Sequence, residues 1–175
     1  NGDVILSYKY INEIKVKFNE IKGNFLIDNN KLNSLEGSPE IVEKNFSCAN
    51  NKLRSLKYGP KIVKKVFACN SNALYSLEYC PEFAESFLCV NCNLLNLNDL
   101  KTEITQDFMC NYNKLTNLKN CPKVLNGIFN CGYNELESLK DGPEIVNGEY
   151  YANNNKINTI EYLPKKVKSN CLLLR

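Results

Sequence analysis

The nine cysteines are the residues of this chain whose side chains could act as nucleophiles, metal ligands or disulfide partners. Cys89 and Cys92 form a Cys-x-x-Cys pair, and a repeat of about 21 residues would bring Cys69 and Cys110 beside it. Four thiolates form a ligand set that zinc accepts. The same spacing arises without metal if cysteine fills two columns of a repeated pattern. Core packing is therefore the first interpretation, and a zinc site is the alternative.

The repeat is marked by an aromatic residue that recurs every 20 or 21 positions. With this residue as position 0 of a unit, it occurs at Phe25, Phe46, Phe67, Phe87, Phe108, Phe129 and Tyr150. Val4 and Cys171 lie one step before and one step after this series. The pattern predicts a single domain over 1–175, with units starting at about 4, 25, 46, 67, 87, 108, 129 and 150 and a partial unit from 171.

Other positions of the unit are as regular. Positions 7, 10 and 17 are apolar in every complete unit, and all six prolines lie at position 14. Position 2 is often cysteine, and position 5 is asparagine at Asn30, Asn51, Asn72, Asn113, Asn134 and Asn155. Alternation at positions 0 to 2 predicts a short strand, and each unit can bury its apolar face only against its neighbours. The asparagines are expected to hydrogen-bond backbone groups of the adjacent turn.

The pattern F-x-C-x-x-N-x-L resembles the L-x-L-x-x-N/C-x-L signature of leucine-rich repeats. Cys92 fits it, because cysteine is accepted at the asparagine position. The resemblance implies a leucine-rich-repeat solenoid with a parallel β-sheet on its concave face and an extended, irregular convex side with few helices. The short unit and its proline resemble the repeat domains of bacterial effector ubiquitin ligases. Phrases such as FMCNYNKLTNLKNCP resemble small repeat proteins of phages and other large DNA viruses more closely.

The cysteines of position 2 are expected to be reduced thiols. Their side chains would point the same way from neighbouring parallel strands, which suits disulfide geometry poorly, and an odd total argues against a complete set of disulfides. Cys80 and Cys121 precede prolines two units apart and should not bond to each other. Reduced thiols indicate an intracellular setting, namely the cytoplasm (of a host cell if the protein is viral) or the inside of a virion.

Several classes of function are excluded by composition. Without histidine, no Ser-His, Cys-His or histidine-metal site can form. No glycine-rich phosphate loop is present, and the helical catalytic domain of the effector ligases has no counterpart in this sequence. We therefore expect no enzyme activity and no cofactor. The lysines are scattered and the net charge is only +3, which argues against nucleic acid. No apolar run is long enough to span a membrane.

The expected partner surface consists of strand residues that point out of the sheet, at positions −1, 1 and 3, with position 4 at the rim. In the middle of the chain these positions hold apolar and aromatic residues, namely Val66, Leu88, Val90, Met109, Tyr112, Ile128, Tyr133 and Tyr151. A contiguous exposed patch of this kind usually marks an interaction site. The alternative interpretation is that β-propensity alone favours such residues in strands.

A second expected interface is the last strand, where NCLLLR places Leu172 and Leu174 outward. An uncapped apolar edge strand invites pairing, so we expect a continuation of the chain, or another chain, to cover it. The sequence thus predicts a non-catalytic protein-binding module. One alternative is a structural component of a virion or other multiprotein assembly, held through its terminal edge strands by self-association or by other chains. The other alternative is the substrate-recognition part of a larger effector.

Overall fold

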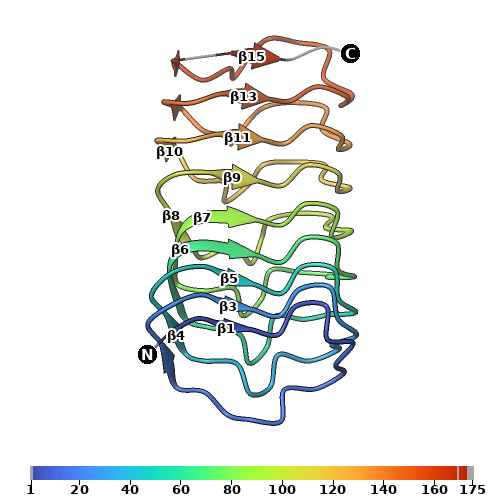
Figure 1. The fold of residues 1–175 in the computed structure, drawn as a ribbon. Coiled ribbons are helices and arrows are strands. Elements are labelled where there is room, and N and C mark those ends of the chain that lie inside the picture. The colour runs from blue at the N-terminus through green and yellow to red at the C-terminus, as the bar shows by residue number, and fades with distance from the viewer. Residues whose placement is uncertain (1, 169, 173–175) are drawn as a thin grey trace.

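Successive turns of the chain stack into a solenoid in the computed structural model, which describes residues 2–168 and 170–172 (Figure 1). Each turn adds one strand to a parallel sheet, here called the main sheet, and the strands follow one another in sequence order. The strands are β1 (Val4–Ile5), β3 (Phe25–Leu26), β5 (Phe46–Ser47), β6 (Ile62–Ala68), β7 (Phe83–Leu88), β9 (Phe108–Met109), β11 (Phe129–Asn130), β13 (Tyr150–Tyr151) and β15 (Cys171–Leu172).

A second strand of most turns lies at positions 16 and 17, shortly before the main strand; we call these the corner strands. They are β2 (Glu20–Ile21), β4 (Ile41–Val42), β8 (Glu103–Ile104), β10 (Val124–Leu125), β12 (Ile145–Val146) and β14 (Lys166–Val167). In β6 and β7 the corner segment and the main strand are continuous. The described residues contain no helix, where the sequence predicted few, and therefore none that is long and apolar enough to cross a membrane.

The strand register follows the sequence period. Val4 pairs with Phe25, and the same column of partners continues through the main sheet to Tyr150 and Cys171. The one unit of 20 residues is absorbed between β6 and β7, where the register shifts between Val63 and Val66. The missing residue therefore alters one corner of the stack, and the columns remain aligned on both sides of it.

The core consists of the apolar columns that the sequence predicts. The rings of position 0 are buried from Phe25 to Tyr150, and neighbouring rings are in contact, with centroids 5.0 Å apart for Phe67 and Phe87. The leucines of positions 7 and 10 are also buried in the middle turns. Position 10 of the last complete unit is an exception, because Ile160 is 75% exposed where no described turn covers it.

The asparagines of position 5 form the expected ladder between turns. Asn51 Oδ1 accepts a hydrogen bond from the Leu32 N–H at 3.0 Å, while its Nδ2 donates to the carbonyls of Ile27 and Cys48, both at 3.0 Å. The same arrangement recurs at the other ladder asparagines, for example at Asn134. Each amide thereby satisfies backbone groups of two turns that strand pairing leaves without partners.

The two units without asparagine at position 5 share a local rearrangement. At Cys92 the thiol makes only one of the amide's bonds between turns, to the Cys69 carbonyl at 3.2 Å. The following residue, Asn93, adopts a left-handed φ of 61°. The N–H groups of Cys92 and Leu94 then both donate to Asn113 Oδ1, at 2.9 and 3.0 Å. The unit of Lys9 shows the same two features. The ladder therefore continues across both exceptions through the asparagine of the next turn.

Replacing Tyr150 by phenylalanine is expected to stabilise the protein. Tyr150 occupies the ring column that is otherwise phenylalanine, and its hydroxyl is buried without a hydrogen-bond partner among the described residues. Removing an unsatisfied buried hydroxyl relieves about 1 kcal/mol or more, which urea unfolding would detect as a higher midpoint. A lower midpoint would contradict this prediction and show that the hydroxyl is solvated in solution.

Candidate functional site

The residues predicted to bind a partner lie together on the outer face of the main sheet, the side turned away from the core. We call this set the central patch; it comprises Val66, Leu88, Val90, Met109, Tyr112, Ile128, Tyr133 and Tyr151. Tyr112 is 51% and Tyr133 43% exposed, and the other members are half-buried. The side chains come from β6, β7, β9, β11 and β13 and from the turns around them, so consecutive units of the main sheet present them together.

Strand register determines which members of the patch are neighbours. Leu88 pairs with Met109 across β7 and β9. Asn130 of β11 separates Met109 from Tyr151 in the same row. At position −1, Val66 and Ile128 belong to units that are three repeats apart. The two units between them have the polar residues Ser86 and Asp107 at this position. The patch is therefore apolar and continuous at Leu88 and Met109, and is interrupted by polar side chains toward both ends.

Tyr112 and Tyr133 form a stacked pair at the rim of the patch. Their ring centroids are 4.2 Å apart and the planes are inclined by 12°. Both residues have left-handed backbones, with φ of 56° and 55°, as does position 4 of every complete unit. Asparagine, which fills several of the other units, is tolerated in this conformation more readily than tyrosine. Other tyrosines of the chain, such as Tyr58 and Tyr79, also have left-handed backbones, so this conformation neither excludes nor requires tyrosine here.

A second hydrogen-bond ladder, which sequence reasoning did not identify, runs along position −1 at the edge of this face. Asp3, Asn24 and Asn45 each accept, through Oδ1, the N–H of the corresponding residue in the next turn, at 2.8 to 3.2 Å. Asp107 Oδ1 accepts the Ile128 N–H in the same way at 2.7 Å. The signal in the sequence was the frequency of Asp and Asn at position −1.

Seven of the nine cysteines are buried in the core, whereas Cys80 is half-buried and Cys171 is exposed. All nine are free thiols, and those of position 2 from Cys48 to Cys131 are buried. Burial in apolar surroundings raises the pKa of the Cys110 thiol. Cys92 donates to the Cys69 carbonyl at 3.2 Å. Within the described residues, no group of three or more His, Cys, Asp or Glu side chains is arranged to hold a metal ion.

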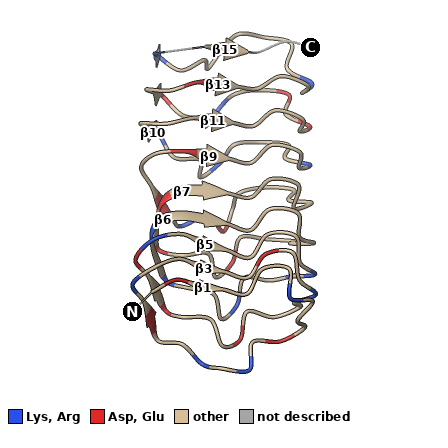
Figure 2. Cartoon of the chain, viewed as in Figure 1, with Lys and Arg blue, Asp and Glu red and all other residues tan. Residues whose placement is uncertain are grey.

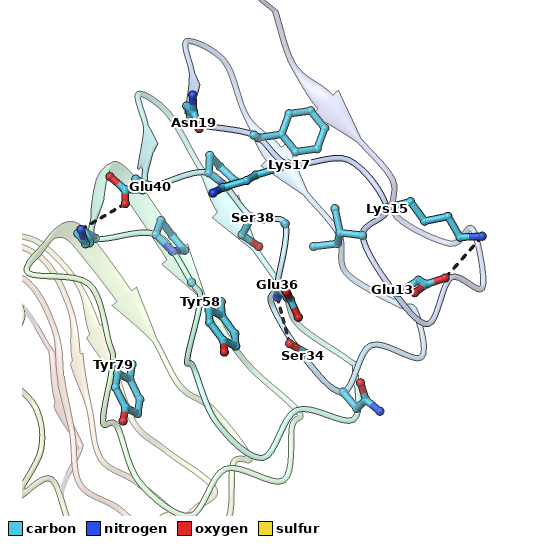
Figure 3. Close-up of a pocket in the computed structure, with 18 of the residues that line it drawn as sticks. Glu13, Lys15, Lys17, Asn19, Ser34, Glu36, Ser38, Glu40, Tyr58 and Tyr79 are labelled. Carbon is cyan, nitrogen blue, oxygen red and sulfur yellow. Dashed lines mark hydrogen bonds and ion pairs between the residues drawn. The ribbon is translucent and has the colours of Figure 1, made fainter.

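A groove along the turns of the first four units was not predicted from the sequence (Figure 3). Its lining includes Tyr58 and Tyr79, and its charged side chains include the ion pair of Lys61 with Glu40 at 3.3 Å. It is lined by positions 8 to 15 of these units, and the residue types at those positions do not indicate a hollow. The groove offers weaker grounds for a function than the central patch, because its scattered charges and separate tyrosines define no reaction.

The terminal edge strand is described only in part. In β15, Leu172 is 47% exposed and Cys171 is also exposed, and β15 pairs with β13 on one side. Leu174, the other predicted edge residue, lies outside the described residues.

Comparison with known proteins found no matching family model, no matching curated protein and no matching solved structure. The resemblance to leucine-rich repeats therefore continues to rest on the sequence pattern, and the fold on the geometry of the solenoid.

Proposed function

We propose that this chain is a leucine-rich-repeat module of phage or viral origin that binds another protein without catalysing a reaction. The binding surface in this proposal is the outer face of the main sheet, which would be the concave face of such a solenoid. The observation that carries the proposal is the central patch, where half-buried aliphatic side chains of the main sheet lie beside an exposed, stacked tyrosine pair in the turns that follow.

The composition of the patch matches that of protein interfaces. Met and Tyr are enriched in interface cores, and tyrosine contributes a large contact area while losing little conformational entropy. Strand residues on a rigid sheet also bind with little reorganisation, which favours affinity. β-Propensity accounts for valine or isoleucine in strands, but not for Tyr112 and Tyr133, which lie after the strands in left-handed backbone.

A structural role is the second candidate, and it is favoured by β15. Its exposed Leu172, together with the exposed Ile160 of the last complete turn, gives this end an apolar surface. In an assembly, a neighbouring chain would pair with the edge and cover these side chains.

The test compares capture of proteins from a lysate by three baits. The first is the native chain, and the second carries Leu88→Asn, Met109→Asn and Ile128→Asn. Asparagine occurs at the same unit positions in Asn130 and Asn24, so the fold should tolerate these changes. The third bait is a matched control with Tyr75→Asn, Leu95→Asn and Val124→Asn, which changes three exposed residues outside the central patch.

We expect a partner that binds the native and control baits and is lost from the patch variant, with circular dichroism unchanged in all three. A partner retained by the patch variant would refute binding through the main sheet. Capture of only further copies of this chain would favour the structural role, and Leu172→Lys should then abolish that self-association.

A further inference from the structure

The outer face of the main sheet differs in charge from the rest of the molecule. At positions −1, 1 and 3 of the described units, every charged residue is a carboxylate, namely Asp3, Asp28, Asp107 and Glu149. No lysine or arginine occupies these positions, although the chain contains 22 of them. The basic residues lie instead in the turns and in the corner segments (Figure 2). In a chain of net charge +3, this face is therefore locally negative.

The carboxylates of this face are not neutralised by the protein itself. The ion pairs found in the described residues lie elsewhere, as between Glu40 and Lys61 at 3.3 Å and between Glu144 and Lys165 at 2.7 Å. Asp107 and Glu149 form none. Their acceptor bonds come from uncharged donors, for example the Ile128 N–H to Asp107 and the Asn170 amide to Glu149.

The fold does not need the negative charge at Asp107. Asn24 and Asn45 occupy the equivalent position in other turns, and their side-chain oxygens accept the same backbone N–H as Asp107 does. An asparagine at 107 would therefore keep the bond to the Ile128 N–H, but its Nδ2 could not accept the Ser86 hydroxyl, which donates to Asp107 Oδ2 at 3.3 Å. The carboxylate is an addition to this structural role, placed beside the apolar residues of the central patch.

The arrangement of these groups defines what could complement them. Asp107, Ile128 and Glu149 occupy position −1 of consecutive turns, so the two carboxylates lie about 10 Å apart at the strand spacing of a sheet. Met109 and Tyr151 lie two residues further along the same strands and on the same face. The Tyr112–Tyr133 pair lies beyond them at the rim, where a tyrosine ring can also attract a cation.

From this arrangement we infer that the partner presents a basic segment to the central patch, with lysine or arginine side chains set among apolar ones. The inference rests on the proposed function and names the chemistry of its partner. The basic side chains pair with Asp107 and Glu149, and the apolar side chains cover Leu88 and Met109. The negative face also speeds the encounter with a positively charged partner, at a rate that falls as salt is raised.

A defined probe tests this inference without a known partner. Peptides are selected from a random displayed library on the native protein, and their affinities are measured for four purified proteins. These are the native chain, the Leu88→Asn, Met109→Asn, Ile128→Asn variant, a charge variant with Asp107→Asn and Glu149→Gln, and a control with Glu78→Gln and Glu137→Gln. The control residues are exposed and form no ion pair within the described residues.

We expect selected peptides to be rich in lysine or arginine and to lose binding to the Asn variant of the patch. The charge variant should bind them about five-fold more weakly, as expected for the loss of exposed ion pairs, and the difference should shrink with added salt. The control should bind like the native chain. Patch-dependent peptides without basic residues, unaffected by the charge variant, would overturn the inference and leave the proposed function standing. Peptides that bind all four proteins equally would contradict both.

Discussion

Asn113→Ala is expected to destabilise the protein by about 3 kcal/mol or more, because the change leaves several buried backbone groups without partners. Asn113 Oδ1 accepts from the N–H groups of Cys92 and Leu94, and its Nδ2 donates to the carbonyls of Cys89 and Cys110. Asn113 is itself buried. Asn134 Nδ2 still donates to the Cys110 carbonyl. The N–H groups of Cys92 and Leu94 and the Cys89 carbonyl lose the ladder partner that Asn113 gives them.

Urea unfolding followed by circular dichroism measures the effect, with Asn33→Ala as the control because Asn33 is exposed. Amide exchange should also localise it. Each turn of a solenoid contacts only its neighbours, so protection should fall first around 89–94 and 110–115 and remain high near Phe25. If the free energy of unfolding falls by less than about 1 kcal/mol, as in the control, the Asn113 amide contributes little to the stability of the solenoid.

The columns of the solenoid could be predicted from the sequence because each repeats in one residue type. Position 0 is aromatic and position 5 is asparagine in most units. The regular spacing of the rings predicts that they are buried in the core, and the amide's donors and acceptor predict that it bonds backbone groups of adjacent turns. The strand register of Val4 with Phe25 and the ladder bonds of Asn51 agree with that pattern. Because the units repeat, equivalent positions can be compared within the one chain, as they would be between homologous sequences.

The departures from this regularity could not be predicted. The left-handed backbone of Asn93 depends on what replaces asparagine at the residue before it, and the register shift between Val63 and Val66 depends on how a shorter unit is accommodated. Ile160 has the residue type of the core and is exposed because no described turn packs on it. The backbone conformation of Asn93, the register shift and the exposure of Ile160 each depend on contacts with the neighbouring turn. The residue type at one repeat position does not specify those contacts.

The candidate site shows the same division. Alternation along a strand indicates which side chains face outward, so the central patch could be located from the sequence. The stacking of Tyr112 on Tyr133 and the acceptor role of Asp107 required coordinates, because both depend on the distance between adjacent turns. The groove beside Tyr58 is lined by the same positions of successive units, but its hollow shape depends on the backbone path of these turns and gave no sequence signal.

The second large effect is expected at the ring column, where Phe87→Ala should destabilise the protein by about 3–5 kcal/mol. Phe87 is fully buried and contacts rings on both sides, with centroids 5.0 Å away in Phe67 and 6.1 Å away in Phe108. Alanine would leave a cavity between consecutive turns that neither neighbouring ring can fill without leaving its own turn. Tyr75→Ala is the control, because it removes an aromatic side chain that is 69% exposed.

Because of where Phe87 lies, the shape of the urea unfolding curve of Phe87→Ala is informative as well as its midpoint. The cavity would lie beside the register shift between β6 and β7, the one irregularity of the main sheet. Weakening this interface should uncouple the turns before it from those after it. We therefore expect the single urea transition of the native chain to broaden into two, with a lower apparent m-value. A single transition of unchanged slope, displaced to lower urea, would instead show that the turns remain one cooperative unit across the shorter repeat.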